Sequence, residues 1–277
     1  MSRTFAWTGT LTAVSSIAHG GETRGTITLL RRELITQPDG TTVPVPVISG
    51  NSIRGRLRRL GEELLRDTLG YEGQLPLSAA HALRGGGALA KTSGEPLSGA
   101  RLRRLRELVP QLGVFGAAAG GRIIDGALQV GKAVPLVTET NRITGAHATR
   151  SAFEATQIET YTRQDDSLRH PFADLVADDS PDAGDQQMLY RLETFPAGTT
   201  FSTWIRLVRA TELEHAFFCD VLASFARDGS LGGRAATGHG LVRVDLSACP
   251  DHTPVVDWRS HLAERRDDAL LALQALT

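Results

Sequence analysis

The segment from Ser49 to Gly70 carries the clearest helical pattern in the sequence, and it follows a short strand-like stretch. Small polar residues at 49, 51 and 52 can cap its first turn, and the glycine at 70 is a natural stop. Its apolar residues recur at helical spacing along one stripe: Ile53, Leu57, Leu60, Leu64 and Leu65. A helix with one apolar stripe must cover a sheet or other helices, so we expect a layered fold.

Alternation of apolar and polar residues predicts strands on both sides of this helix. The other predicted elements are strands at 5–14, 190–195 and 201–208, a helix at 213–227, a last strand after residue 240 and a tail helix at 258–276. The order strand, helix, strands, helix, strand indicates an α+β sandwich of the RRM or ferredoxin-like kind.

Two stretches interrupt this order. Residues 71–100 are rich in Gly, Ala, Ser and Pro and are predicted to be irregular, with a helix following at 102–108. Residues 138–187 are polar and predict a projecting hairpin followed by an acidic loop. We therefore expect a single domain over 1–277, with a helical or irregular insertion at about 71–115 and a second insertion at 138–187.

The composition excludes several classes of protein. Of 277 residues, 41% are hydrophobic and 22% charged, as in ordinary globular proteins. Cys219 and Cys249 lie far apart and outside any C-x-x-C pair, so we expect no disulfide framework, no metal site and no cofactor. No apolar stretch approaches the ~18 residues that cross a membrane, and the first residues do not resemble a signal peptide. The expected location is the cytoplasm.

Charge is distributed unevenly along a chain whose net charge is −1. Arginines crowd residues 54–59 and again residues 101–106, whereas acids concentrate between 165 and 185. Such asymmetry permits a basic groove on a nearly neutral molecule. Nucleic acid therefore stays a candidate partner.

The start of the predicted helix, Ser49 to Gly55, is a candidate anion site. Backbone N–H groups at a helix start are unpaired, and the helix dipole adds positive charge there. Arg54 and Arg58 are one turn apart and off the apolar stripe, so both are expected to reach the same phosphate path. The alternative is an ordinary capped helix with solvated arginines, since capping alone explains the polar residues at its start.

A glycine-rich loop, Leu231 to Gly240, is a second candidate. Four glycines within it let the backbone approach a ligand closely or present N–H groups to an anion, beside Arg234 and His239. The loop is neither a Walker motif nor a dinucleotide fingerprint, because no Gly-Lys-Ser/Thr occurs and a strand follows it. The alternative is a flexible hairpin loop.

A third candidate is the polar segment Glu139 to Arg150, whose alternative is an exposed hairpin of ordinary composition. The histidines at 19, 147, 215 and 239 can act as acids or bases, yet none belongs to a recognisable metal or catalytic motif. The sequence therefore marks no active site.

Four motifs, taken in this order, resemble those of the RAMP superfamily of CRISPR proteins, and within it the guide-binding backbone subunits of the Cas-seven-like family. Residues 17–21 resemble the early His-Gly turn of that family, and residues 47–58 resemble its signature helix. Residues 139–145 resemble the segment that leads into its thumb, and residues 231–240 resemble its closing glycine-rich loop.

The resemblance implies an RRM-like palm with an inserted thumb hairpin that lies across a guide (cr)RNA. Copies of the chain would assemble along the guide beside other effector subunits and present it to a target nucleic acid. The residues expected to contact RNA are His19, Ser49, Gly50, Asn51, Ser52, Arg54, Arg58, Asn141, Arg142, Thr149, Arg150, Gly232, Gly233, Arg234, Gly238, His239 and Gly240.

Two departures from the family pattern bear on catalysis and subtype. Type III members cleave target RNA with an aspartate ahead of the signature helix, and Thr28 stands at that position here. In the signature itself, Ser49 replaces a proline and Asn51 replaces a serine. A type III-like signature without the acid favours type IV, so we expect no nuclease and no enzyme.

Three alternatives stay open. The first is a RAMP endoribonuclease that processes precursor guide RNA with His19 as general base. The long segment 138–185 argues against it, because that class resembles two ferredoxin-like halves without a thumb. The second is a type III backbone subunit that cleaves target RNA, and the third is a stand-alone RNA-binding module.

Overall fold

The central sheet of the computed structural model has the strand order β13-β1-β12-β8, and all three pairings are antiparallel. The structure describes residues 3–87, 99–119, 122–164, 187–248 and 252–276. The elements of the sheet and the two helices that connect them are β1 (Arg3–Ala13), α1 (Gly50–Leu69), β8 (Leu128–Val130), β9 (Val134–Pro135, paired with β12), β12 (Thr200–Ala210), α6 (Glu212–Asp228) and β13 (Val242–Ala248). This βαββαβ order confirms the predicted α+β class with an RRM-like palm.

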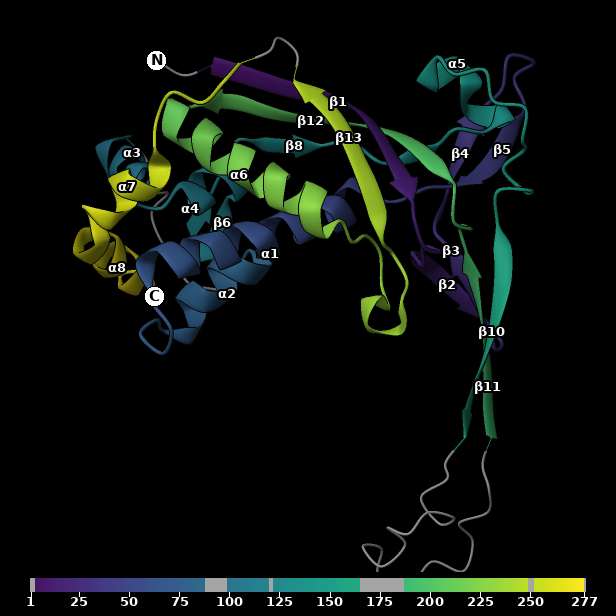
Figure 1. Ribbon diagram of the computed structural model, residues 1–277, viewed down its shortest axis with the longest axis horizontal. Coiled ribbons are helices and arrows are strands. Elements are labelled where there is room, and N and C mark those ends of the chain that lie inside the picture. The colour runs from purple at the N-terminus through teal and green to yellow at the C-terminus, as the bar shows by residue number, and fades with distance from the viewer. Residues whose placement is uncertain (1–2, 88–98, 120–121, 165–186, 249–251, 277) are drawn as a thin grey trace, which may run out of the picture.

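Both palm helices begin and end as their sequences predict. Ser49 is the N-cap of α1, accepting a hydrogen bond from the amide of Ser52, and Gly70 ends the helix in the left-handed conformation at φ 58°. In α6, Thr211 and Glu214 form a capping box. Figure 1 shows both helices against one face of the central sheet, where their apolar stripes are buried. No helix in the described part of the chain is long and apolar enough to span a bilayer.

The first insertion is more helical than the sequence indicated. It contains α2 (Leu77–Gly85), α3 (Gly99–Leu108) and α4 (Pro110–Phe115), followed by the short pair β6 (Ala117–Ala119) and β7 (Arg122–Ile124). The prediction of an irregular segment over 71–100 was wrong for α2. Its buried stripe consists of Ala79, Ala82 and Leu83. Alanine favours helices but contributes little to a hydrophobic pattern, so this helix is hard to detect from periodicity.

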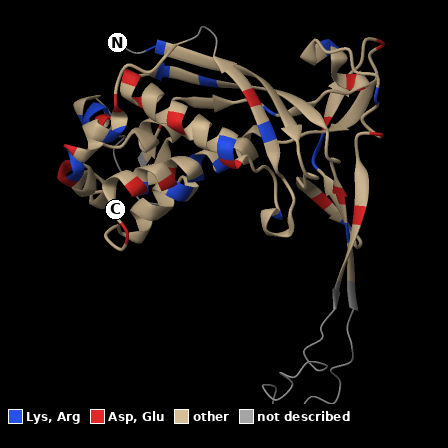
Figure 2. Cartoon of the chain, viewed as in Figure 1, with Lys and Arg blue, Asp and Glu red and all other residues tan. Residues whose placement is uncertain are grey.

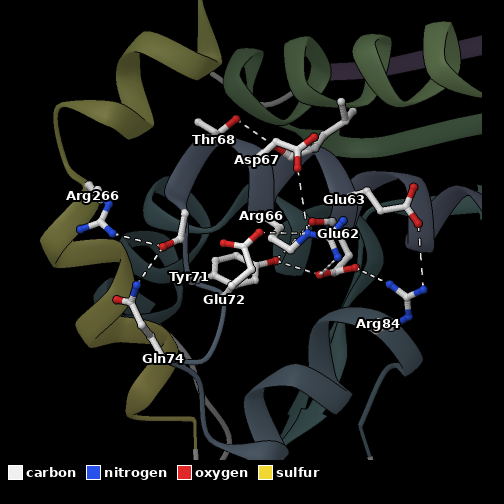
Figure 3. A network of polar contacts seen from close by, with 12 residues as sticks. Glu62, Glu63, Arg66, Asp67, Thr68, Tyr71, Glu72, Gln74, Arg84 and Arg266 are labelled. Atoms are coloured by element: carbon white, nitrogen blue, oxygen red, sulfur yellow. Dashed lines mark hydrogen bonds and ion pairs between the residues drawn. The ribbon is translucent and has the colours of Figure 1, made fainter.

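A polar network joins the end of α1 to α2 and to the tail, as Figure 3 shows. Glu62, only 7% exposed, accepts hydrogen bonds from Arg84 at 2.7 Å and from the hydroxyl of Tyr71 at 3.2 Å. Burial and the neighbouring Glu62 raise the pKa of Tyr71, so its hydroxyl stays a donor. Arg266 donates to the carbonyl of Leu69 at 2.7 Å. The network therefore fixes the helical layer at one end of α1.

The tail differs from the single predicted helix over 258–276. It forms α7 (Trp258–Ala263) and α8 (Arg266–Gln274), with a break at residues 264–265. Trp258 and Leu262 of α7 and Leu270 and Leu273 of α8 are all buried. The break lets both short helices present their apolar residues to the core.

A second sheet projects from the palm, in the order β10-β11-β3-β2. Its strands are β2 (Gly20–Arg24), β3 (Ile27–Leu30), β10 (Gln157–Gln164) and β11 (Gln187–Thr194), and a separate hairpin of β4 (Arg32–Thr36) and β5 (Thr42–Pro46) lies beside it. Figure 1 shows β10 and β11 extending away from the palm as a long hairpin. We call the β10–β11 hairpin the thumb.

The thumb begins later than the sequence indicated. Residues 138–156 form a 3₁₀ turn (Thr138–Thr140), the short helix α5 (Asn141–Thr144) and irregular backbone, and the hairpin starts only at Gln157. The acidic loop predicted before residue 187 lies outside the described residues, apart from its flanks in the thumb strands. At the thumb's base, Glu193 accepts from the amide of Leu30 at 2.9 Å and from Arg32, so the thumb is anchored to β3 and β4.

The Arg106→Ala substitution is predicted to lower the free energy of unfolding by about 3–5 kcal/mol, because it leaves a buried charge without its partner. Glu214 is fully buried and accepts from Arg106 at 2.6 and 2.8 Å. Urea denaturation measures the loss. Arg104→Ala is the control, since its pair with Asp268 is exposed and such pairs contribute about 0–1 kcal/mol. Equal losses in the two variants would contradict this assignment.

Candidate nucleic-acid interface

Three of the four sequence motifs meet just beyond the end of β1. The amide of Gly233 in the glycine-rich loop donates to the carbonyl of Ala18 at 2.8 Å. One residue later, His19 Nε2 accepts from the amide of Ser49, the N-cap of α1, at 3.1 Å. The early His-Gly turn therefore lies between the start of α1 and the glycine-rich loop, and its backbone and side chain contact both.

The first residue of α1, Gly50, packs closely against strand β8 of the central sheet. A Cβ at Gly50 would lie 2.4 Å from the carbonyl oxygen of Val130, so only glycine fits there. The amides of Gly50 and Asn51 donate to no acceptor in the described part of the chain, whereas Ser52 donates to Ser49. Asn51 is exposed. These two free N–H groups at the positive end of a helix can bind an anion.

His19 supports this end of the helix as a neutral imidazole. Its burial, and secondarily the charge of Arg31, lower its pKa below the ordinary value. Only an unprotonated Nε2 can accept from the Ser49 amide, so the hydrogen bond agrees with the neutral form. The Nε2 lone pair is therefore occupied.

The signature arginines are placed differently from the prediction. Arg58 is 8% exposed and donates to the carbonyls of Phe115, Gly116 and Ala82 at 2.7, 2.9 and 3.2 Å. Arg54 is partly buried and donates to the same Phe115 carbonyl at 2.6 Å. The expectation that both lie free, off the apolar stripe, is therefore corrected. Their guanidinium groups satisfy the carbonyls at the end of α4.

Two arginines of the second arginine-rich stretch, residues 101–106, also form ion pairs within the protein. Arg104 pairs with Asp268, and Arg106 pairs with Glu214. Figure 2 shows basic and acidic residues interspersed along the ribbons of the helical layer. The two arginine-rich stretches of the sequence thus lie on helices α1 and α3. Much of their charge is used within the protein and is unavailable to a basic groove.

Backbone geometry requires glycine at several points of the glycine-rich loop. Gly232 and Gly240 have φ of 77° and 89°, and a Cβ at these positions would meet a backbone oxygen at 2.2 and 2.1 Å respectively. Gly238, with φ of 87°, faces open space. Arg234 is exposed at φ 63° and lies over the ring of Tyr190 at 4.8 Å. The loop therefore has a rigid base and an exposed tip, rather than the freedom of a flexible hairpin loop.

His239 is 4% exposed and joins the glycine-rich loop to the thumb. The hydroxyl of Tyr161, on β10, donates to Glu159 at 2.6 Å and lies 2.6 Å from His239 Nε2. Because the tyrosine proton goes to Glu159, His239 Nε2 donates to the Tyr161 oxygen, and its Nδ1 lies 3.0 Å from Ser16 Oγ. Burial and Glu159 raise the pKa of Tyr161 to about 12. For Glu159, partial burial acts to raise the pKa. Hydrogen bonds from Tyr161 and Thr194 outweigh it and lower the pKa of Glu159 to about 2.

This chain of contacts, from Ser16 through His239 and Tyr161 to Glu159, is called the thumb lock below. It was not predicted, since the sequence placed His239 on an exposed anion-facing loop. Nothing in the spacing of Tyr161 and His239 indicates that they meet. Their contact depends on how the thumb folds back against the glycine-rich loop.

The fourth motif does not join the other three. Asn141 closes its own loop, donating to the carbonyl of Ala148 at 2.9 Å and accepting from that residue's amide at 2.8 Å. Arg142, Thr149 and Arg150 are exposed, and Arg150 donates to the carbonyl of Glu154. Asn141 therefore shapes the segment, and Arg142 and Thr149 are left to contact a ligand.

A groove over the central sheet lies beside this segment, and two of its lining residues, Val130 and Gly131, pack against Gly50 at the start of α1. Its lining includes Gly131, Lys132, Ile143, Thr144 and Trp204. Trp204 is 39% exposed on β12, and Ile143 is 57% exposed. Sequence reasoning missed Lys132 and Trp204, although Trp204 occupies an outward position in an alternating strand. The guanidinium of Arg206 lies 4.9 Å from the centre of the Trp204 ring, and an exposed indole beside a cation is suited to stacking on a nucleobase.

Comparisons with known proteins identify the family and the fold. A sequence profile of the RAMP superfamily matches residues 10–243. Among solved structures, a chain described as "Type IV-B CRISPR Complex" is similar at 34% sequence identity and a TM-score of 0.62. The match covers 93% of this chain and 96% of that chain. No curated protein matches the sequence.

The Arg58→Ala substitution is predicted to destabilise the protein by about 2–4 kcal/mol, because it leaves buried carbonyls without a charged donor. Thermal or urea unfolding measures the loss. The control is Arg59→Ala, one residue further along α1, where the side chain is exposed and the change is expected to stay within about 0.5 kcal/mol. A stable Arg58→Ala protein with weakened RNA binding would instead support a phosphate contact.

Proposed function

The chain belongs to the RAMP superfamily, and from this membership we propose that it is a guide-RNA-binding backbone subunit of a type IV CRISPR effector complex. In this proposal, copies of the chain assemble along the guide beside other effector subunits. The guide is presented for pairing with a target nucleic acid, and the subunit cleaves neither strand.

The observation that carries the proposal is the match to a chain of a type IV-B CRISPR complex. At 34% identity the match extends over 93% of this chain and 96% of that chain. A shared fold alone would not support a shared role. Sequence identity at this level over the whole chain is stronger support.

The geometry around α1 supports an RNA backbone passing across the palm. The free amides of Gly50 and Asn51 provide donors for a phosphate, and the exposed tip of the glycine-rich loop lies nearby. The groove is lined by Trp204 and by Lys132, which is paired with Glu33, and it also includes Ile143 and Thr144, beside the exposed Arg142. Amides, one or two cations and one indole suit recognition of backbone and base faces, without reading of sequence.

The surroundings of Thr28 support the absence of target cleavage. Thr28 lies in β3, opposite Thr23 of β2, and the two hydroxyl oxygens are 3.3 Å apart. A hydroxyl pair on neighbouring strands offers neither a carboxylate ligand nor a general base at this position. His19, the general base of the endoribonuclease alternative, already accepts from Ser49. That alternative therefore receives no support from the geometry of His19.

Native mass measurement on guide RNAs of increasing length tests the proposal. A backbone subunit is predicted to give complexes whose number of copies rises stepwise with RNA length. One copy per RNA at every length would support the stand-alone module instead. Site-specific cutting of repeat RNA in EDTA, lost in His19→Ala, would contradict the proposal.

A charge variant tests the path of the RNA. Arg142→Ala is predicted to weaken RNA binding on all sequences alike. It should also reduce the steepness of log binding constant against log salt concentration by about 1, the value for one lost phosphate contact. The matched control is Arg103→Ala, an exposed arginine on α3 at the helical end of the molecule. Equal effects of the two substitutions would place the RNA elsewhere.

A further inference from the structure

Two histidines and a glutamate gather at the start of α6, in the part of the molecule far from the thumb (Figure 1). Glu212 and His215 are one helical turn apart, and His252 comes from the segment that leads to α7. One ligand atom from each of the three lies within 4.8 Å of the others. Glu212 Oε2 and His252 Nε2 are 3.3 Å apart. None of these residues takes part in the candidate RNA interface.

His215 is held rigidly within this cluster. It is 1% exposed, and the ring of Phe5 stacks on it with centroids 3.8 Å apart and planes 12° from parallel. Its Nε2 lies 3.4 Å from Cys219 Sγ. Its Nδ1 is buried and has no hydrogen-bond partner in the described part of the chain. An unpartnered buried imidazole nitrogen is costly, so this atom is available to a ligand from outside the polypeptide.

We propose that Glu212, His215 and His252 bind a divalent transition metal ion, with Zn²⁺ the best match. Two imidazoles and one carboxylate are a common zinc donor set. Zinc–ligand bonds of about 2.0–2.1 Å in tetrahedral geometry place ligand atoms about 3.3–3.4 Å apart. The separation of Glu212 Oε2 from His252 Nε2 already meets this requirement, and metal binding would draw these two less buried side chains toward the ligand atom of His215, which lies within 4.8 Å of theirs.

The surrounding contacts agree with this assignment. Coordination through Nδ1 of His215 leaves its Nε2–H to donate to Cys219 Sγ, an arrangement that orients a metal-bound imidazole. Arg3 lies 3.6 Å from the other carboxylate oxygen of Glu212 and leaves Oε2 available. The fourth position is open to water. The donor set is hard to see in the sequence, because His252 lies in a different segment from the Glu-x-x-His pair.

Such an ion would join three parts of the chain. Phe5 on β1 stacks on His215, Glu212 and His215 begin α6, and His252 precedes the helices of the tail. Trp258 of α7 packs edge-on against Phe217 at 5.0 Å, so the tail has its own contact with α6 a few residues beyond the site. Metal binding would therefore stabilise the attachment of the C-terminal helices to the palm.

The test uses full-length protein without a histidine tag, treated with EDTA, dialysed and titrated with ZnCl₂ by calorimetry. One equivalent is expected to bind, and the unfolding midpoint is expected to rise with added Zn²⁺. Co²⁺ in place of Zn²⁺ should give visible absorption bands of a nitrogen- and oxygen-ligated ion. His252→Asn and Glu212→Gln are each expected to weaken binding at least tenfold.

The control is His81→Asn, which removes an exposed histidine on α2 and should leave binding unchanged. Neither His252 nor Glu212 is buried, so their variants are expected to fold, and circular dichroism checks this. Binding that is equally strong in His252→Asn and His81→Asn would overturn the proposal as adventitious. A wild-type protein that binds no Zn²⁺ would overturn it as well.

Discussion

The contact between the first residue of α1 and the central sheet determines where the other functional parts lie. Gly50 approaches the carbonyl of Val130 so closely that a methyl group would not fit, and this places the open end of the helix against the groove over β8 and β12. His19 also contacts this end of the helix, accepting a hydrogen bond from the Ser49 amide. The packing of Gly50 on Val130 and Gly131 and the hydrogen bond from Ser49 to His19 thus bring the free amides close to the groove and to the early His-Gly turn.

The thumb lock extends this arrangement beyond the palm. His239 belongs to the glycine-rich loop, whose base bonds to residues just after β1, and its ring contacts Tyr161 on β10. Glu193 gives the thumb a second attachment at β3 and β4. A hairpin held at both points keeps a fixed direction relative to the palm. The glycine-rich loop therefore orients the thumb in addition to any contact with RNA.

Periodicity predicted the palm well but could not predict where individual polar side chains would lie. The apolar stripe of α1, its cap at Ser49 and its stop at Gly70 were all visible in the sequence. The burial of Arg58 was not, because it depends on α4, an element of the insertion, ending beside α1. His239 was placed on an exposed loop for the same reason, since its partner is a thumb residue. Local spacing predicts elements, whereas these contacts join segments that are distant in sequence.

Crosslinking of the purified protein to a guide RNA containing 4-thiouridine, followed by peptide mapping, tests most directly whether RNA crosses the palm at the start of α1. Crosslinks are predicted at residues 49–52, in the exposed tip 234–238 of the glycine-rich loop and at Trp204 in the groove. Crosslinks confined to α3, α7 and α8, at the helical end of the molecule, would contradict the proposed path.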